Sequence, residues 1–374
     1  MSKSKLIVIS AGGTGGHMFP AEALALDLIS RGYHVTLITD KRGGEYKPFA
    51  DGVPVHVIRS AGLYSGVLSK VKSVFALGLG LMQAARLLNK IKPDVVIGFG
   101  GYPSFPAVYA ATKKKIPTII HEQNAVLGKA NAYLAPKVDR IAVAWPNVSG
   151  VEEVDAIRCI ITGNPVRPEI SALYAKPYPI IEQDGLLKIF VMGGSLGATV
   201  FSTVLPETIK KLSPAHQARL QIVQQCRQED IEEVREAYKD TAVDFELKTF
   251  FDDVPAQLEK CHLFIGRSGA STVSEVATAG RPAIFVPYPH HADQQQKRNA
   301  NAVFDVGGAW VMTQDGFTSD ALLARIETFL QNPEALFNAA ENARACGKPD
   351  AARKLGNLVT ALASGWNKTN ETVL

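Results

Sequence analysis

The stretch Leu6-Ile7-Val8-Ile9-Ser10-Ala11-Gly12-Gly13-Thr14-Gly15-Gly16-His17 decides the fold of the first half of this chain. An apolar run typical of a buried strand leads into a turn built from glycine, and the turn opens toward a helix. A helix that begins in this way offers backbone N–H groups and the positive end of its dipole to a phosphate or another electron-rich oxygen. The stretch therefore predicts an anion site, with a titratable histidine at its end.

A second stretch in the other half of the chain has the same design. The strand-like run Lys188–Met192 is followed by Gly193-Gly194-Ser195-Leu196-Gly197-Ala198. Glycine also makes tight turns in any doubly wound fold, without binding anything. Two matched turns, one of which carries a histidine, favour a function and predict two similar α/β domains that share a ligand.

Length and composition agree with two domains. A chain of 374 residues exceeds what a single core usually supports. Its longest apolar run, Val74–Met82, is shorter than the ~20 residues of a membrane span, and the start of the chain lacks the apolar stretch of a signal peptide. A net charge of +4 suits an anionic ligand or membrane surface and is too small to indicate nucleic acid. The 4 cysteines are scattered without a metal-binding or disulfide pattern, which favours a reducing cytoplasm.

Continuous Val/Ile runs alternate with helix-like stretches, which is typical of parallel sheets buried on both faces. Strands are predicted in the first half at Leu6–Ile9, His34–Thr39, Val55–Ile58, Val95–Gly98, Thr118–His121 and Arg140–Val143, with a helix at Pro20–Ser30. In the second half they are predicted at Lys188–Met192, Leu220–Val223, Leu263–Gly266, Ala283–Val286 and Trp310–Met312. Helices are predicted there near Ser202–Leu212, Glu229–Tyr238, Ser271–Ala279 and Gln294–Phe304.

The aperiodic, proline-containing segment Trp145–Pro168 is the predicted hinge, and the chain after Pro333 is expected to be helical to its end. We therefore expect an α/β protein with two Rossmann-like doubly wound domains separated by a cleft. The expected domains are 1–163, 164–340 and a helical tail, 341–374, that returns to the first domain.

Several nucleotide-binding classes are excluded by the glycine turns. The first has Met18 where a dinucleotide fingerprint has its third glycine, although Asp40 could otherwise pass for a ribose-binding acid. Neither turn continues into the Gly-Lys-Ser/Thr of a P-loop. The sequence also has no Asp-x-Asp, which commonly holds a metal in nucleotide-sugar sites. If a diphosphate is bound, helix termini and side chains must neutralise it, so we expect neither a metal nor a cofactor.

A set of short motifs occurs in a specific order. They are Gly12–His17, Gly100-Gly101-Tyr102-Pro103-Ser104, His121-Glu122-Gln123-Asn124, Gly163-Asn164-Pro165-Val166-Arg167, Gly193-Gly194-Ser195, Arg267-Ser268-Gly269-Ala270 and Thr272-Val273-Ser274-Glu275. Together they resemble the MurG family of peptidoglycan glycosyltransferases. Leu196 departs from the family, because some members carry a glutamine in the second glycine turn.

The resemblance implies a GT-B fold and an inverting reaction in peptidoglycan synthesis, and with it roles in cell shape and division. N-acetylglucosamine would pass from UDP-N-acetylglucosamine to the 4-hydroxyl of undecaprenyl-pyrophosphoryl-N-acetylmuramoyl-pentapeptide. The enzyme would be peripheral on the cytoplasmic face of the cell membrane.

Such a reaction needs a base near the acceptor hydroxyl and positive potential near the diphosphate. His17 is the first candidate base, because an imidazole ordinarily has a pKa near ~6.5 and this one ends a glycine turn. It could instead cap the turn or bind a phosphate. Glu122, at a strand end, is the competing base.

Donor binding is expected mainly in the second domain, where Glu275 could accept both ribose hydroxyls. The bland alternative is a capping box, with Ser271 or Thr272 capping the helix. By resemblance, Phe251 contacts the uracil through its backbone and Gln296 contacts the sugar. Without the resemblance, Phe251 would be interpreted as a core residue and Gln296 as part of a solvated helix face. Arg167 would likewise be interpreted as part of a linker stiffened by prolines. The expected substrate-binding residues are Thr14, Gly15, Gly16, Asn124, Arg167, Ser195, Phe251, Ala270, Ser271, Thr272, Val273, Ser274, Glu275 and Gln296.

An apolar helical stripe with basic flanks predicts contact with an anionic membrane surface. The stripe consists of Val67, Leu68, Val71, Val74, Phe75 and Met82, and the flanks of Lys70, Lys72, Arg86 and Lys90. A stripe of this kind more often packs in the protein core. The lipid-linked acceptor that the resemblance implies favours the interpretation as a membrane-binding surface.

Two other functions are kept as alternatives. One is a different GT-B sugar transferase with a lipid acceptor such as diacylglycerol, and the other is a non-catalytic protein that binds a nucleotide sugar.

Overall fold

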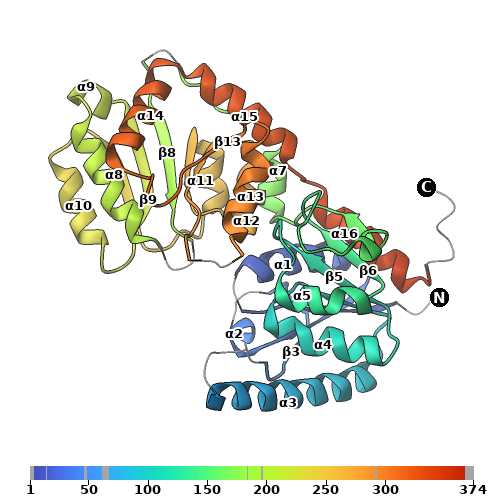
Figure 1. The fold of residues 1–374 in the computed structure, drawn as a ribbon. Helices are drawn as coiled ribbons and strands as arrows, with labels where there is room; N and C mark the ends of the chain where they lie inside the picture. The colour runs from blue at the N-terminus through green and yellow to red at the C-terminus, as the bar shows by residue number, and fades with distance from the viewer. Residues whose placement is uncertain are drawn as a thin grey trace. The chain divides into compact units, whose positions relative to one another are not determined.

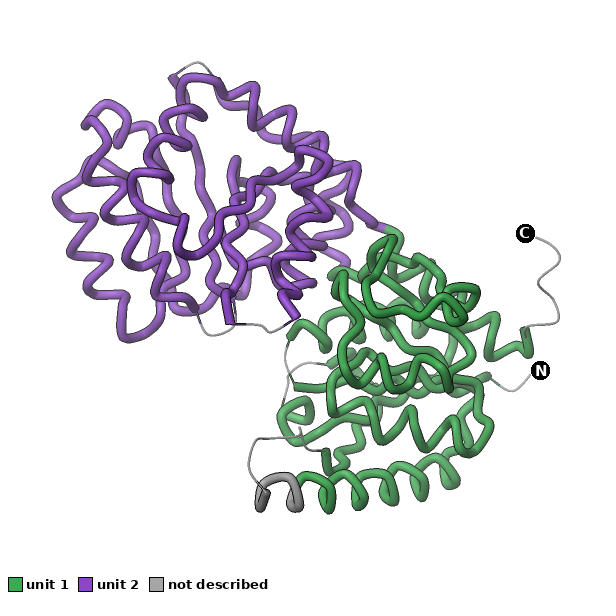
Figure 2. Tube along the Cα trace, in the orientation of Figure 1, with its two compact units in different colours: residues 1–167, 350–374 green, residues 168–349 purple. Residues whose placement is uncertain are grey.

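The computed structural model describes residues 4–13, 15–45, 49–60, 67–182, 184–194, 197–290 and 293–366, with the backbone alone for 67–72. The chain forms two compact units (Figure 2). Unit 1 combines Met1–Arg167 with Asp350–Leu374, and unit 2 is Pro168–Pro349. The chain therefore leaves unit 1 after Arg167 and enters it again at Asp350, whereas the sequence placed these divisions at 163 and 341.

Unit 1, drawn as a ribbon with unit 2 in Figure 1, contains a sheet of parallel strands. The strand order is β3-β2-β1-β4-β5-β6-β7. Its strands are β1 (Leu6–Ser10), β2 (His34–Thr39), β3 (Val55–Val57), β4 (Val95–Gly98), β5 (Thr118–Glu122), β6 (Arg140–Val143) and β7 (Cys159–Ile161). Its helices are α1 (Gly15–Ser30), α2 (Lys41–Gly44), α3 (Val67–Ile91), α4 (Gly101–Lys113), α5 (Lys129–Leu134), a 3₁₀ turn (Ala135–Lys137), α6 (Glu153–Ala156) and α16 (Ala351–Ala363).

Unit 2 repeats this arrangement with a parallel sheet in the order β10-β9-β8-β11-β12-β13. Its strands are β8 (Leu187–Met192), β9 (Leu220–Gln225), β10 (Asp244–Lys248), β11 (Leu263–Gly266), β12 (Ala283–Phe285) and β13 (Ala309–Val311). Its helices are α7 (Pro168–Leu173), α8 (Thr199–Lys211), α9 (Pro214–Gln217), α10 (Ile231–Lys239), α11 (Val254–Lys260), α12 (Ala270–Thr278), α13 (Gln295–Phe304), α14 (Ser319–Gln331) and α15 (Glu334–Cys346).

Successive residues of β1 point to opposite faces of the sheet, as strand geometry requires. Ile7 and Ile9 join the core that α1 and α16 close, whereas Val8 joins the core beneath α3, α4 and α5. Both faces are covered, which is why the strands read as continuous apolar runs. The doubly wound fold predicted from those runs is confirmed in both units.

The structure corrects three local predictions. Helix α1 begins at Gly15, so Pro20 lies inside it and not in its first turn. The predicted hinge contains α6 and the edge strand β7, and the sequence also missed the edge strand β10. The tail is two helices, α15 and α16, separated at Gly347–Pro349, where glycine and proline end a helix.

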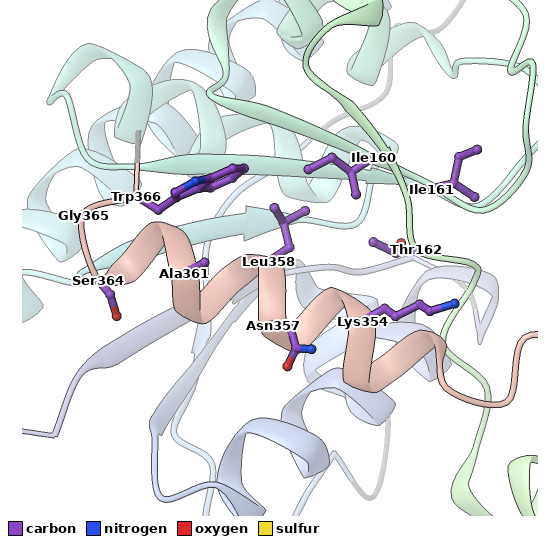
Figure 3. A pocket seen from close by; sticks show the side chains of 10 residues that line it. All are labelled: Ile160, Ile161, Thr162, Lys354, Asn357, Leu358, Ala361, Ser364, Gly365 and Trp366. Atoms are coloured by element: carbon purple, nitrogen blue, oxygen red, sulfur yellow. The ribbon is translucent and has the colours of Figure 1, made fainter. Parts of the chain in front are cut away.

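Helix α16 packs on α1 and places Leu355, Leu358 and Val359 in the core of unit 1. On the side of β7, a pocket of about 620 Å³ opens beside this helix (Figure 3). It is lined by Ile160, Ile161, Thr162, Lys354, Asn357, Leu358, Ala361, Ser364, Gly365 and Trp366. None of these is a predicted site residue.

Candidate functional site

Each sheet has one point where the strand order reverses, and ligands of doubly wound folds bind beyond the carboxyl ends of the strands at this point. In unit 1, β1 lies between β2 and β4, so the reversal lies between the loops that follow β1 and β4. In unit 2, β8 and β11 hold the same positions. These loops carry the two glycine turns and the Gly100–Ser104 and Arg267–Ala270 motifs.

The first glycine turn is held against the end of β2 by Asp40. One carboxylate oxygen of Asp40 accepts hydrogen bonds from the backbone N–H of Gly13, at 3.3 Å, and of Gly43, at 3.0 Å. A side chain at Gly12 would lie 2.7 Å from this carboxylate oxygen and 2.7 Å from the Pro103 ring, so only glycine fits there. Asp40 therefore supports the turn. These contacts explain an acid at this position without a role in binding ribose. Thr14 lies outside the described residues.

The Gly100–Ser104 motif makes room for the ring of His17. Gly100 and Gly101 have φ of 80° and 69°, a region that glycine enters without strain. A Cβ at Gly101 would lie 3.3 Å from Nε2 of His17, and one at Gly100 would lie 3.1 Å from the amide nitrogen of Asn131. The loop after β4 is therefore shaped around the imidazole that α1 presents.

His17 is the first member of a chain of polar side chains that runs into unit 1. Its Nδ1 lies 3.1 Å from Oε1 of Gln123, and the Gln123 amide nitrogen lies 3.0 Å from Nδ1 of His121. Nε2 of His121 then lies 3.0 Å from the carbonyl oxygen of Gly163. Burial lowers the pKa of His121 to about 4, against a smaller raising effect of the Gly163 carbonyl, so His121 is neutral at neutral pH.

The carboxylate of Glu122 is turned into its own loop. One oxygen accepts from the backbone N–H and the side-chain amide of Asn124, both at 3.0 Å. The other accepts from the N–H of Gly128, at 2.9 Å, and from the amide of Asn131, at 2.8 Å. The side chain is 2% exposed, and these four donors match the acceptor capacity of a carboxylate. Glu122 therefore fixes the loop that carries Gln123 and Asn124.

Arg167, the last residue of unit 1 before the chain enters unit 2, lies next to the first glycine turn. Its guanidinium stands over the ring of Phe19, 4.9 Å from the ring centroid. That ring in turn covers the start of α1, because a Cβ at Gly15 would lie 2.8 Å from it. A cation is thus held at the helix N-terminus, where it adds to the positive potential of the helix dipole.

The second glycine turn is as tight as the first. A Cβ at Gly193 would lie 2.3 Å from the backbone nitrogen of Ala198, and one at Gly197 would lie 2.8 Å from Arg227. The N–H of Gly193 donates to Oε1 of Gln225, at 3.1 Å, which ties the turn to the end of β9. Ser195 and Leu196 lie outside the described residues.

Helix α12 begins directly after the motif that follows β11. Its N-cap is Gly269, with no side-chain cap, so Ser271 and Thr272 lie in the first turn. Neither residue is therefore the N-cap, and the alternative of a capping box begun by Ser271 or Thr272 is wrong. Glu275 lies on the same helix face as Ser271, one turn further along, and is 7% exposed. The Val273 side chain is buried, and the Ser274 hydroxyl donates to the carbonyl oxygen of Ala270 at 2.9 Å.

Two other predicted donor ligands, Phe251 and Gln296, contact other residues of unit 2, as does Arg267 of the motif after β11. The Phe251 side chain is buried edge-on against Phe190, which leaves only its backbone for a ligand. Oε1 of Gln296 accepts from the N–H of Tyr288 at 2.9 Å and so holds the loop after β12. Arg267 donates to the carbonyl oxygens of Val286 and Pro287 and to Gln314, and burial lowers its pKa.

Sequence reasoning did not select three residues that the structure makes notable. Gln123 lay in a quoted motif, but its link to His17 joins residues 106 positions apart. Asn164 is 2% exposed, and neither polar atom of its amide has a hydrogen-bond partner among the described residues, which is unusual for a buried amide. Gln294, the N-cap of α13, has a φ of 50°, and such strain is concentrated at functional sites.

Among the described residues, no group of three or more His, Cys, Asp or Glu side chains is arranged to hold a metal ion. Besides the carboxylates of Asp40, Glu122 and Glu275, the polar groups near the two reversal points include backbone N–H groups, hydroxyls, amides, guanidinium groups and the imidazole of His17. Such a set is suited to bind phosphate and sugar oxygens.

Two doubly wound units, each with a glycine turn at its reversal point, are the architecture of the GT-B fold. The sequence profile of the glycosyltransferase family 28 N-terminal domain matches residues 7–143, and that of the glycosyltransferase family 28 C-terminal domain matches residues 188–355. The chain belongs to glycosyltransferase family 28.

Curated relatives resemble this chain along nearly its whole length. A protein of Rhodospirillum centenum is 50% identical over 361 residues, which cover 96% of this chain and 95% of the relative. One of Zymomonas mobilis is 41% identical over 370 residues, covering 99% of this chain and 96% of the relative. Both are named UDP-N-acetylglucosamine–N-acetylmuramyl-(pentapeptide) pyrophosphoryl-undecaprenol N-acetylglucosamine transferase.

Solved structures agree. The crystal structure of Acinetobacter baumannii MurG is 31% identical, with a TM-score of 0.77, and the match covers 95% of this chain and 99% of that one. A UDP-GlcNAc 2-epimerase from Neisseria meningitidis has a TM-score of 0.67 at 15% identity, which shows a shared fold alone.

Proposed function

We propose that this protein transfers N-acetylglucosamine from UDP-N-acetylglucosamine to the 4-hydroxyl of undecaprenyl-pyrophosphoryl-N-acetylmuramoyl-pentapeptide, with inversion at the anomeric carbon. The observation that carries the proposal is the 41–50% identity, along nearly the whole chain, to transferases named for this donor and this acceptor. His17, whose ring lies against the loop of Gly101, supports the proposal, because such a reaction needs a base.

His17 is the proposed base, and Glu122 is not. A base must have a free lone pair within reach of the hydroxyl proton. Both oxygens of Glu122 accept hydrogen bonds inside unit 1, whereas no hydrogen bond to Nε2 of His17 is found among the described residues. His17 therefore meets the requirement that Glu122 does not.

Unit 2 is proposed to bind the donor. The start of α12 and the second glycine turn provide N–H groups and hydroxyls for the diphosphate. Glu275 lies five residues after Ala270, about 7.5 Å along the helix axis, and its carboxylate is the proposed acceptor for the ribose hydroxyls. Backbone groups near Phe251 would contact the uracil, and the start of α13, with Gln296, the sugar. In unit 1, Asn124 and Arg167 are proposed as further ligands.

Catalysis is expected to proceed without a divalent cation, because helix N-termini and arginine side chains offset the diphosphate charge in this arrangement. Turnover with a soluble acceptor analogue should stay within twofold of its starting value in excess EDTA. Loss of turnover that added magnesium restores would contradict this expectation.

Helix α3 is the proposed membrane contact. Its segment Ser73–Ile91 is long and apolar enough to cross a membrane by length and composition. One face, however, packs on unit 1 through Ser73, Ala84 and Leu88. Away from this face Val74, Phe75 and Met82 are exposed, and the helix continues into the exposed Arg86 and Lys90. This pattern is typical of a helix that lies in the membrane interface. Val67, Leu68, Val71, Lys70 and Lys72 have no described side chains.

Replacing Phe75 with aspartate should weaken binding to vesicles that contain anionic lipid by about tenfold or more, because Phe75 is 67% exposed and its burial in lipid would be worth ~1.5–3 kcal/mol. Co-sedimentation with such vesicles measures this. The control is Phe304→Asp, since Phe304 is an exposed phenylalanine of unit 2. Equal binding by wild type and both variants would exclude α3 as the contact.

The function itself is tested by measuring UDP release from UDP-N-acetylglucosamine by the purified protein. Release that depends on the lipid-linked muramoyl-pentapeptide, with N-acetylglucosamine on the product, is the expected result. Release that depends instead on diacylglycerol would favour the alternative lipid acceptor. Binding of the nucleotide sugar without transfer to either acceptor would favour a non-catalytic binding protein.

A further inference from the structure

We propose that Gln123 is a positioning residue that holds His17 in the tautomer with its proton on Nδ1 and its lone pair on Nε2. The inference deepens the proposed function, because it rests on His17 as the base. It concerns which nitrogen of the ring takes the proton, and what sets that choice.

The direction of each hydrogen bond follows from the far end of the chain of side chains. The carbonyl oxygen of Gly163 is only an acceptor, so Nε2 of His121 must carry a proton. Because His121 is neutral, its Nδ1 is then an acceptor and takes a hydrogen bond from the Gln123 amide nitrogen. The same amide nitrogen also donates to the carbonyl oxygen of His121, at 3.2 Å, which can only accept.

These two bonds fix the orientation of the Gln123 amide, and its oxygen is left facing His17. An amide oxygen cannot donate, so Nδ1 of His17 must carry the proton at 3.1 Å from Oε1. Neutral His17 therefore has its lone pair on Nε2, the nitrogen next to Gly101.

Burial makes this assignment strict. His121 is fully buried, Gln123 is 1% exposed, and the Phe99 ring lies 5.3 Å from the His121 ring. Water cannot replace a partner there, so reversing one bond would leave two buried donors or two buried acceptors face to face, which is costly. The carbonyl of Gly163 thus determines the state of a ring three side chains away.

The arrangement suits the proton transfer. As the acceptor hydroxyl oxygen forms its bond to the anomeric carbon and the bond to UDP breaks, the hydroxyl proton passes to Nε2. The resulting imidazolium keeps its Nδ1–H bond to Oε1 of Gln123. Without Gln123 the ring would be free to place its proton on Nε2, where it could not act as a base.

The first test does not involve the reaction. The ¹⁵N spectrum of the free wild-type protein, labelled at histidine, should show His17 at high pH with a protonated Nδ1 and an unprotonated Nε2. Its signals are assigned by their loss in His17→Ala. The opposite tautomer would overturn the inference even if the protein is the proposed transferase.

Two variants separate positioning from packing. Gln123→Leu removes both polar functions, so we expect a mixture of His17 tautomers and a fall in kcat of about 10–100-fold with little change in KM. Gln123→Glu keeps an oxygen for Nδ1 of His17 and loses the donor to His121. We expect it to retain the His17 tautomer and more activity than the leucine variant, with a changed His121 spectrum.

The matched control is Gln217→Leu. Gln217 is a buried glutamine of unit 2 that makes three hydrogen bonds, to the carbonyl oxygens of Ile209 and Leu212 and from the N–H of Ala242. This variant should lose stability and leave the His17 spectrum unchanged. If Gln123→Leu keeps the wild-type His17 tautomer, Gln123 is not the positioning residue. If that variant does not fold, the spectra of the wild type and of Gln123→Glu decide.

Discussion

Replacing His17 with alanine is expected to lower kcat by about 10²–10⁴-fold, the usual effect of losing a general base. The affinity for UDP should change by less than about twofold, since most of the proposed nucleotide ligands lie in unit 2 and His17 is not one of them. Single-turnover kinetics and titration calorimetry with UDP on the same variant measure the two quantities. His17 is half-buried and its ring lies against the loop of Gly101, so the alanine variant should fold.

The control for this prediction is Glu122→Gln. It removes the competing carboxylate. In the wild type each carboxylate oxygen accepts hydrogen bonds, so the NH₂ group of the variant's amide would face donors, and we expect reduced stability. In the folded fraction, kcat should remain within about tenfold of wild type. A loss of kcat equal to that of His17→Ala would make Glu122 the base. Parallel losses of kcat and UDP affinity in His17→Ala would instead assign the histidine to phosphate binding.

Replacing Glu275 with alanine is expected to weaken UDP binding by about 10–150-fold. The estimate corresponds to ~1.5–3 kcal/mol for hydrogen bonds between a carboxylate and the two ribose hydroxyls. Titration calorimetry with UDP measures it, and titration with UDP that lacks the ribose 2′-hydroxyl identifies the contact. For that ligand, the wild type and the variant should differ less.

Glu275 is also buried, so its loss affects α12 directly. The free energy of unfolding of the variant must therefore be measured beside its affinity. Glu275→Gln, which keeps one acceptor oxygen, should fall between alanine and wild type in UDP affinity. Unchanged UDP affinity in a destabilised Glu275→Ala would reduce the residue to a packing role.

The central strands could be predicted from sequence because they are buried on both faces. All four residues of β4 are buried, for example, and their Val-Val-Ile-Gly run needs no partner to be recognised. The edge strands β7 and β10 were missed. β7 has only three residues and exposes Ile161, while β10 alternates charged and apolar residues as a half-exposed strand does.

The candidate site was predictable where local chemistry decides it and not where distant segments meet. A glycine turn that opens toward a helix indicates an anion site by itself. The hydrogen bonds of Glu122 depend on α5, and the link from Gln123 to His17 depends on the pairing of β1 with β4 and of β4 with β5. The start of α12 was misplaced by one residue, because glycine as an N-cap gives a weaker signal than serine.

The late position of α16 in the chain has a consequence for biosynthesis. Unit 2 is one continuous segment, so it can fold as soon as its last helix leaves the ribosome. Unit 1 has to wait, because Leu355, Leu358, Val359 and Leu362 belong to its core and are made only after the whole of unit 2. Until then the face of α1 that they cover stays open to water and to chaperones. A nascent chain that stops before residue 350 would carry a folded second half and an unfinished first one.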